Sequence, residues 1–190
     1  MFGVVCILVL LLGTRTILRV LDWKSEDALW SSAQYISITS PNNRNNLGDM
    51  YMRNNNYEKA IEEFGMAIRL NPKYAAAYHN LANVYLKKQE YGQALYFYGQ
   101  ALAIDPNLWQ TYQSIALIHF NQGSYSEAIR NASIGISINP TNPQMYVNLG
   151  IIFLSAKDVT SARKNFEKAL EVYPNYSEAI KALEAIKGKN

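Results

Sequence analysis

The sequence is short of charge and of cysteine. Only 17% of its 190 residues are Asp, Glu, Lys or Arg, below the roughly 25% of an average soluble domain, and the formal net charge is +3. A dedicated nucleic-acid binder carries a clustered basic surface, so this small excess argues against DNA or RNA as a partner. The single cysteine, Cys6, excludes an internal disulfide and leaves the redox compartment open.

The sequence also lacks the motifs of catalysis and cofactor binding. It contains no Gly-rich phosphate loop, no HExxH and no GxSxG. The two histidines, His79 and His119, are 40 residues apart and have no Cys, His or carboxylate at zinc spacing nearby. We therefore predict that the chain is not an enzyme, and that it takes no cofactor, no metal and no small-molecule substrate.

An apolar segment opens the chain. Residues 1–14 carry no charge, and apolar residues resume after Arg15 and continue to Leu21. A helix of fourteen residues spans about 21 Å, short of a roughly 30 Å hydrocarbon core. Extension to Leu21 closes that gap if Arg15 and Arg19 reach the headgroups. We therefore predict a transmembrane or anchor helix over 1–21, membrane contact through it, and a single-pass localisation.

Two alternatives exist for this segment. A cleaved signal peptide is disfavoured because no Lys or Arg precedes the apolar run and no small-x-small site follows it. A buried soluble helix is disfavoured because no comparably apolar segment follows to pack against it.

A 34-residue period runs through the rest of the chain. Prolines recur at this interval, at Pro72, Pro106, Pro140 and Pro174. A Leu or Ile followed by a small residue does the same, at Leu47-Gly48, Leu81-Ala82, Ile115-Ala116 and Leu149-Gly150. An alanine recurs at Ala60, Ala94, Ala128 and Ala162, and a further position holds Phe64, Tyr98, Ala132 and Phe166.

Apolar spacing within each period is helical, at i, i+3, i+4 and i+7 on either side of a short polar break. Each period is therefore predicted to be two amphipathic helices, and its proline ends the second helix. Four such repeats cover 41–174, at about 41–74, 75–108, 109–142 and 143–176. Tyr96-Phe97-Tyr98 falls on one predicted helix and is expected to divide between core and surface instead of forming a stacking platform for bases.

These residues resemble the tetratricopeptide repeat (TPR), whose 34-residue helix–turn–helix has large, small and proline positions at these offsets. The resemblance implies an all-α fold, a right-handed superhelix whose first helices line the concave side, and binding of a protein or an extended peptide. Three residues depart from the pattern. Arg44 stands where an aromatic is usual, and Ala132 and Gly135 replace Phe and Ala, which predicts looser packing in the third repeat.

Segments at both ends are predicted to cap the array. Residues 22–40 fit a degenerate half-repeat or N-terminal cap, because Ser25-Glu26-Asp27 is a typical helix start. Residues 177–190 fit a capping helix and tail. In that helix Ile180, Leu183 and Ile186 are expected to face the array while lysines keep the other side in water.

The candidate binding residues lie on the first helices. Four equivalent positions hold Asn46, Asn80, Ser114 and Asn148. In related arrays an Asn at this position holds the backbone of an extended partner, which a carboxamide can do because it both donates and accepts hydrogen bonds. The alternative is that this Asn is simply the favoured residue there and binds water in the free protein.

Neighbouring first-helix positions extend this candidate face, which turns apolar at Val147, Leu117 and Ile151. The basic residues with which one TPR subset captures a carboxylate are absent, so that activity is not predicted. The predicted peptide-binding residues are Asn46, Asp49, His79, Asn80, Asn83, Gln113, Ser114 and Asn148.

Residues 20–30, followed by Pro41 and Asn46-Leu47-Gly48, resemble a joint in lipid-sugar-using membrane glycosyltransferases of the mannosyltransferase-like class. There the last span runs into TPR repeats. The resemblance implies lumenal or periplasmic repeats, whereas the basic residues after the apolar segment place them in the cytoplasm by the positive-inside rule; we favour the extracytoplasmic side. We predict a membrane-anchored TPR scaffold that binds peptides, or alternatively the non-catalytic, substrate-recruiting C-terminal region of such an enzyme.

Overall fold

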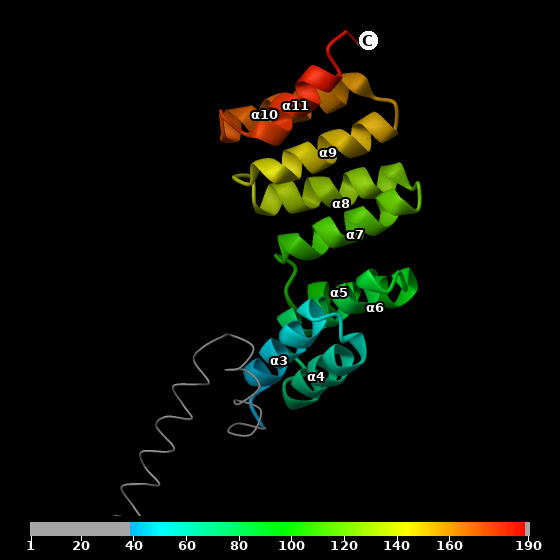
Figure 1. Ribbon diagram of the computed structural model, residues 1–190, viewed down its shortest axis with the longest axis vertical. Coiled ribbons are helices and arrows are strands. Elements are labelled where there is room, and N and C mark those ends of the chain that lie inside the picture. Colours follow the sequence, from blue (N-terminus) through cyan, green and yellow to red (C-terminus); the bar gives the residue numbers. More distant parts are fainter. Residues whose placement is uncertain (1–38, 189–190) are drawn as a thin grey trace, which may run out of the picture. The chain divides into compact units, whose positions relative to one another are not determined.

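The computed structural model describes residues 39–188, and these residues form nine α-helices and no strands (Figure 1). The helices are α3 (Pro41–Arg53), α4 (Tyr57–Leu70), α5 (Ala75–Lys87), α6 (Tyr91–Ile104), α7 (Trp109–Asn121), α8 (Tyr125–Ile138), α9 (Pro143–Ser155), α10 (Val159–Val172) and α11 (Ser177–Ala185). The predicted all-α fold is confirmed for this part of the chain. The right-handed sense of a superhelix stays a prediction.

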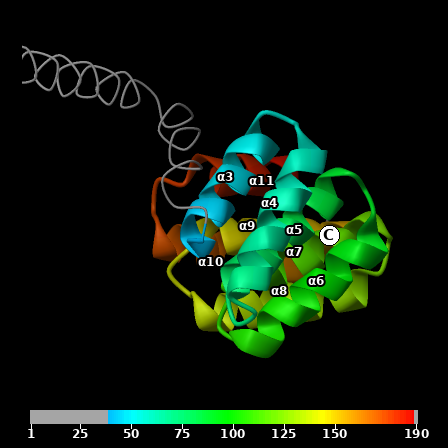
Figure 2. The same ribbon diagram turned by 90° about the horizontal axis from the view of Figure 1, so that it is seen from below.

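The chain forms two compact bodies, which we describe separately. The N-terminal body extends to Val84 and the C-terminal body begins at Tyr85, within α5. In the N-terminal body α3 and α4 lie side by side in both views (Figures 1 and 2). In the C-terminal body α6 packs against α7, α7 against α8, α8 against α9 and α9 against α10. Helices adjacent in sequence are therefore adjacent in the stack of this body.

The turn inside each repeat uses one left-handed residue. Positive φ angles of 57°, 60°, 74° and 66° occur at equivalent positions, which are Asn55, Gln89, Gly123 and Lys157. Only one of the four is glycine, the residue that adopts this conformation without strain. In two repeats the next residue caps the second helix, because Asn56 Oδ1 accepts from the Lys59 amide at 3.3 Å and Asp158 Oδ1 from the Ser161 amide at 2.9 Å.

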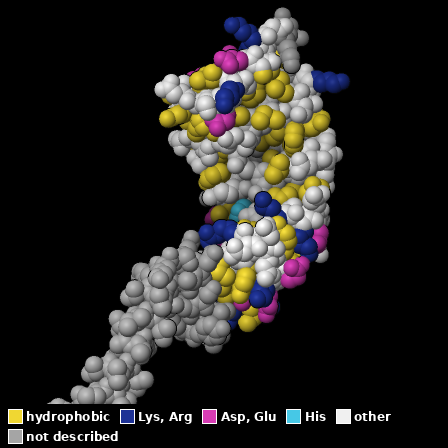
Figure 3. All heavy atoms as spheres, viewed as in Figure 1, with side chains coloured by type: hydrophobic (Ala, Val, Ile, Leu, Met, Phe, Trp, Pro, Cys, Tyr) yellow, Lys and Arg dark blue, Asp and Glu magenta, His cyan; other side chains and the backbone are white. Residues whose placement is uncertain are grey.

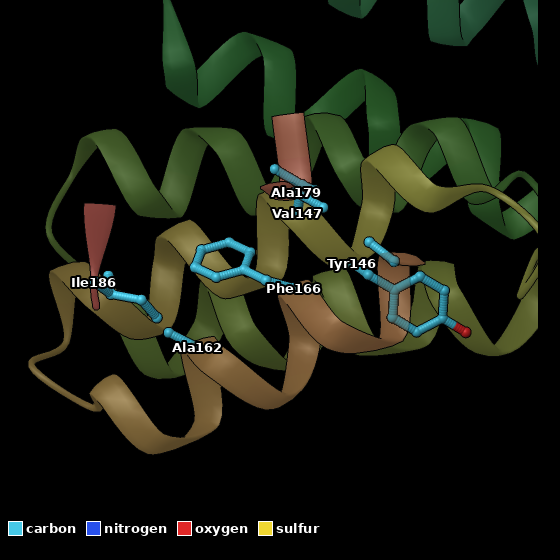
Figure 4. Packing of buried hydrophobic residues seen from close by; sticks show 7 residues of the cluster. Tyr146, Val147, Ala162, Phe166, Ala179 and Ile186 are labelled. Atoms are coloured by element: carbon cyan, nitrogen blue, oxygen red, sulfur yellow. The ribbon is translucent and has the colours of Figure 1, made fainter. Parts of the chain in front are cut away.

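A glycine and an aromatic ring form the centre of the first and fourth repeats. Phe64 and Phe166 are fully buried. A Cβ added to Gly48 would lie 2.7 Å from the Phe64 ring, and one added to Gly150 would lie 2.4 Å from the Phe166 ring. Figure 4 shows the Phe166 ring between α9 and α10. The aromatic ring therefore packs directly against the small residue that was predicted to let the helices approach.

The third repeat differs at both positions where the sequence departs from the TPR pattern. At Gly135 the space is filled, because a Cβ there would lie 3.0 Å from Cε of the buried Met145 on α9. At Ala132 no ring is present, and the buried Ala132 side chain borders an open hollow together with Ala116. Packing is thus compensated at Gly135 and looser beside Ala132.

The helix α11 packs against α9 and α10. Ala179 and Ile186 are buried in this contact and Leu183 packs partly against it, whereas Ile180 is 39% exposed. The apolar face of α11 is therefore turned by one residue from the predicted one. Arg163 Nη2 donates to the carbonyl of Ile186 at 3.3 Å and so binds an orphan carbonyl at the end of the helix.

The predicted anchor helix over 1–21 lies outside the described residues, as does the predicted half-repeat over 22–40 up to residue 38. Between residues 39 and 188 no helix has both the length and the apolar character that a membrane crossing requires. This finding overturns the predicted single-pass membrane localisation and the choice of a membrane side. The structure assigns the chain to no compartment.

Candidate functional site

A hollow of about 500 Å³ opens between α7 and α9 in the C-terminal body. We call it the repeat 3 hollow, and it is lined by Trp109, Gln110, Gln113, Ser114, Ala116, Leu117, Phe120, Ala132, Asn148, Ile151 and Ile152. Three predicted binding residues, Gln113, Ser114 and Asn148, therefore meet at one site. The predicted apolar positions Leu117 and Ile151 line the same hollow and are 47% and 43% exposed.

The residues that line this hollow are uncharged. Neither α7 nor α9 contains an Asp, Glu, Lys or Arg. In Figure 3 hydrophobic side chains gather over α7 to α9. The first helices that line the hollow therefore offer apolar contact and hydrogen bonding, but no ion pair.

The Asn148 carboxamide is held in a defined orientation. The Tyr176 hydroxyl donates to Gln144 Oε1, and Gln144 Nε2 donates to Asn148 Oδ1 at 2.9 Å. Because Asn148 Oδ1 is already an acceptor in this chain, the Nδ2 group is the part of the side chain that can donate to a ligand carbonyl. The network thus presents a donor at the rim of the hollow.

Ser114 has a structural partner as well as a place in the hollow. Its side chain hydrogen-bonds Tyr98, which is fully buried on α6. Burial raises the pKa of the Tyr98 phenol to about 12. A buried hydroxyl requires a partner, so Ser114 supplies one where other repeats have Asn. Tyr96 is 61% exposed, which confirms that Tyr96-Phe97-Tyr98 divides between surface and core.

In the N-terminal body two of the predicted binding residues already have partners within the chain. Asn80 Nδ2 donates to Oδ1 of the buried Asn45 at 3.0 Å, which joins α5 to α3. Asp49 forms an ion pair with Arg53 at 3.0 Å, one turn further along α3. Asn46 is half-buried on the same helix. The polar face predicted from the sequence is present here, but Asn80 and Asp49 already have partners within the chain.

His79 is mostly buried on α5. Desolvation by this burial lowers the pKa of its imidazole to about 4. The side chain is therefore neutral at physiological pH, and it offers a partner hydrogen bonding without charge. Asn83, one turn away, is half-buried.

Val147 was predicted to face the groove, and the structure corrects this. It is buried in the core formed by α9, α10 and α11, where Figure 4 shows it beside Ala179. The capping helix α11 covers this side of α9, so the position is apolar because it is internal. Trp109 and Phe120 also line the hollow, and the sequence did not predict this. From the sequence, Ala132 predicted only looser packing, and it lines the hollow too.

No group of three or more His, Cys, Asp or Glu residues in the described part of the chain could hold a metal ion. The chemistry available at the hollow is therefore that of carboxamides, a hydroxyl, aromatic rings and aliphatic side chains.

Three sequence matches connect the chain with a known family. A family described as TPR repeat matches residues 48–89, and two described as tetratricopeptide repeat match residues 75–108 and 143–176. Together the matches cover half of the chain. No curated protein sequence gives a significant match.

Several solved structures share the fold. A MamA fragment from Desulfovibrio magneticus RS-1 is 20% identical with a TM-score of 0.70, covering 86% of this chain and 94% of that one. YrrB, described as a TPR protein with an unusual peptide-binding site, is 18% identical with a TM-score of 0.65, covering 92% and 87%. PilF from Pseudomonas aeruginosa is 25% identical with a TM-score of 0.68, covering 77% and 69%. With its 34-residue register and its paired helices, the chain belongs to the tetratricopeptide repeat family.

Proposed function

We propose that this chain is a protein-interaction scaffold that binds an extended peptide segment of its partner along the first helices of its repeats. The observation that carries the proposal is the repeat 3 hollow, which joins exposed apolar side chains to carboxamides at its rim. Ligand sites typically combine an apolar concave surface with a few placed polar groups, and the volume of about 500 Å³ lies within their usual range.

The polar groups suit a peptide backbone. Asn148 presents its Nδ2 donors, and Gln113 on the facing helix offers both a donor and an acceptor. An extended peptide exposes alternating carbonyl and amide groups, so carboxamides can pair with it whatever its sequence. Within the N-terminal body, Asn46, His79, Asn83, Asp49 and Asn80 are proposed to form a peptide-binding face of their own, in which Asp49 is oriented by Arg53 and Asn80 by Asn45. YrrB supports the proposal because a relative in fold is itself described as having a peptide-binding site.

The test is selection of displayed random peptides on the full chain, followed by affinity measurements on the best binder. Asn148→Ala is expected to weaken binding about threefold to tenfold, which is the typical effect of one lost hydrogen bond. The matched control is Asn165→Ala on α10, because Asn165 is also half-buried and bonds a backbone carbonyl, that of Ser161 at 2.8 Å. Equal affinities of the two variants, or recovery of no peptide at all, would contradict the proposal.

Recruitment of substrate for a membrane glycosyltransferase stays an alternative prediction. It depends on the junction resemblance, most of which falls before residue 39. The gene sequence upstream of Met1 decides it: an adjoining in-frame polytopic segment supports the alternative, and a stop codon with no such segment nearby contradicts it.

A further inference from the structure

The equivalent positions of the repeats reveal what is missing from the repeat 3 hollow. The position of Ala132 is occupied in the other repeats by Phe64, Tyr98 and Phe166, all fully buried. In the first and fourth repeats the ring lies directly on the glycine of the first helix. In the third repeat that position is Ala116, and both Ala116 and Ala132 line the hollow. The third repeat therefore lacks the aromatic ring that the other three repeats hold at this position.

The size and walls of the hollow fit an aromatic side chain supplied from outside. A buried apolar cavity of about 150 Å³ is enough to hold benzene, and the hollow of about 500 Å³ leaves further room for the adjoining backbone. Trp109 and Phe120 line it and can pack against an entering ring in edge or offset geometry. Leu117 and Ile151 are exposed in the free protein and would be covered by the ligand.

The absence of charged residues on α7 and α9 also limits which side chains of a partner can enter the hollow. Because α7 and α9 carry no Asp, Glu, Lys or Arg, a charged side chain would lose its hydration without gaining an ion pair on these helices. The rim carboxamides suit the peptide groups on either side of the entering residue.

We propose that the repeat 3 hollow is a specificity pocket that receives one aromatic side chain of the bound peptide. This inference rests on the proposed peptide-binding function and adds to it the chemistry of the partner. The partner segment is extended, is uncharged near its anchor and carries a Phe, Tyr or Trp that takes the place of the ring absent at position 132.

The experiment selects displayed random peptides on the full chain and aligns the sequences recovered. The peptides are expected to share one aromatic position, and changing that residue to Ala should weaken binding about tenfold to a hundredfold, the usual effect of losing one buried large apolar side chain. Peptides that bind but share no aromatic position would overturn the pocket and leave the proposed function standing. Recovery of no peptide would overturn both.

Variants of the protein test the same pocket from the other side. The double variant Ala116→Gly with Ala132→Phe recreates the glycine and ring of the first and fourth repeats. It should lower the affinity for the selected peptide at least about tenfold and leave the helical circular dichroism spectrum unchanged. Leu117→Gln with Ile151→Gln alters exposed positions only, so it keeps the test decisive should the first variant fold poorly. Ile180→Gln on α11 changes another exposed isoleucine, which does not line the hollow, and should leave affinity unchanged. Unchanged affinity in the Leu117/Ile151 variant would overturn the pocket.

Two other occupants are distinguished in the same series. A synthetic peptide of residues 1–14 is titrated into the full chain, and sedimentation measures whether the chain associates with itself. If the chain binds the 1–14 peptide or associates with itself, the Ala116→Gly/Ala132→Phe variant should do so equally well. Loss of self-association, or of binding to the 1–14 peptide, in that variant would replace the foreign peptide by the chain itself and overturn the inference.

Discussion

The contact between Gly150 and Phe166 allows a quantitative test of how the repeats pack. A Cβ at position 150 would lie 2.4 Å from a ring carbon, whereas ordinary contacts begin at 3.4 Å, so the buried ring would have to move by roughly 1 Å. Overpacking of this kind destabilises by about 1–3 kcal/mol. The gain of up to about 1 kcal/mol from replacing a helical Gly by Ala offsets part of it. We expect Gly150→Ala to destabilise the chain by about 1–2 kcal/mol.

Gly150→Ala should change the stability in the opposite direction when the Phe166 ring is absent. Phe166→Ala alone should destabilise by about 3–5 kcal/mol, because a fully buried ring is lost. In that background Gly150→Ala meets no ring and should stabilise by up to about 1 kcal/mol. The double variant then carries the Ala–Ala pair that the third repeat already has at Ala116 and Ala132. The predicted coupling between the two sites is about 1–3 kcal/mol.

Urea unfolding followed by circular dichroism measures all four proteins, and midpoints are compared at equal slope. Gly99→Ala is the control, because Gly99 lies on α6 with no atom within 4 Å of an added Cβ, and it should stabilise by about 0.5–1 kcal/mol. If Gly150→Ala has the same effect with and without the Phe166 ring, the glycine is not the seat of the ring and the packing argument fails.

Three further predictions concern buried polar groups and the uncharged face. The pKa of His79 falls from 6.5 to about 4 on folding, so the unfolded chain binds more protons than the folded chain between these pH values. The free energy of unfolding should therefore drop by about 3 kcal/mol as the pH falls through this window. In urea titrations at stepped pH, His79→Gln should remove most of this pH dependence. Ser114→Ala should destabilise by about 1–3 kcal/mol because the Tyr98 hydroxyl loses its partner, and adding Tyr98→Phe should recover most of this in thermal melts; no recovery would show that the hydroxyl is satisfied elsewhere. Affinity for a selected uncharged peptide should change less than about threefold between about 0.05 M and about 0.5 M NaCl by calorimetry, because α7 and α9 lack charged side chains, and a steep salt dependence would contradict the site.

The helices could be predicted from the sequence because every 34-residue period places the same types of residue at the same helix contacts. A proline ends the second helix, and a glycine or alanine lies where two helices meet, so both features recur at fixed offsets. The face of the first helices followed from the same register, and Gln113, Ser114 and Asn148 do meet at one hollow.

Features that depend on a single repeat could not be obtained from the period. Val147 is equivalent in register to Gln113, which lines the hollow, but α11 covers Val147. Ser114 replaces Asn in the row, and only the fold shows that it meets the Tyr98 hydroxyl. Ala132 was recognisable from the period as a missing ring, whereas the packing of Met145 against Gly135 was not.

The central claim is that a peptide lies on the first helices, and an NMR titration tests it most directly. Amide and side-chain amide resonances of the full chain are followed while a selected peptide is added. The account predicts the largest shifts on α7 and α9, including the side-chain NH₂ groups of Gln113 and Asn148, a shift at Ala132 on α8, and small shifts on the rest of α8 and on α10. Largest shifts on α8 and α10, with Gln113 and Asn148 unmoved, would contradict it.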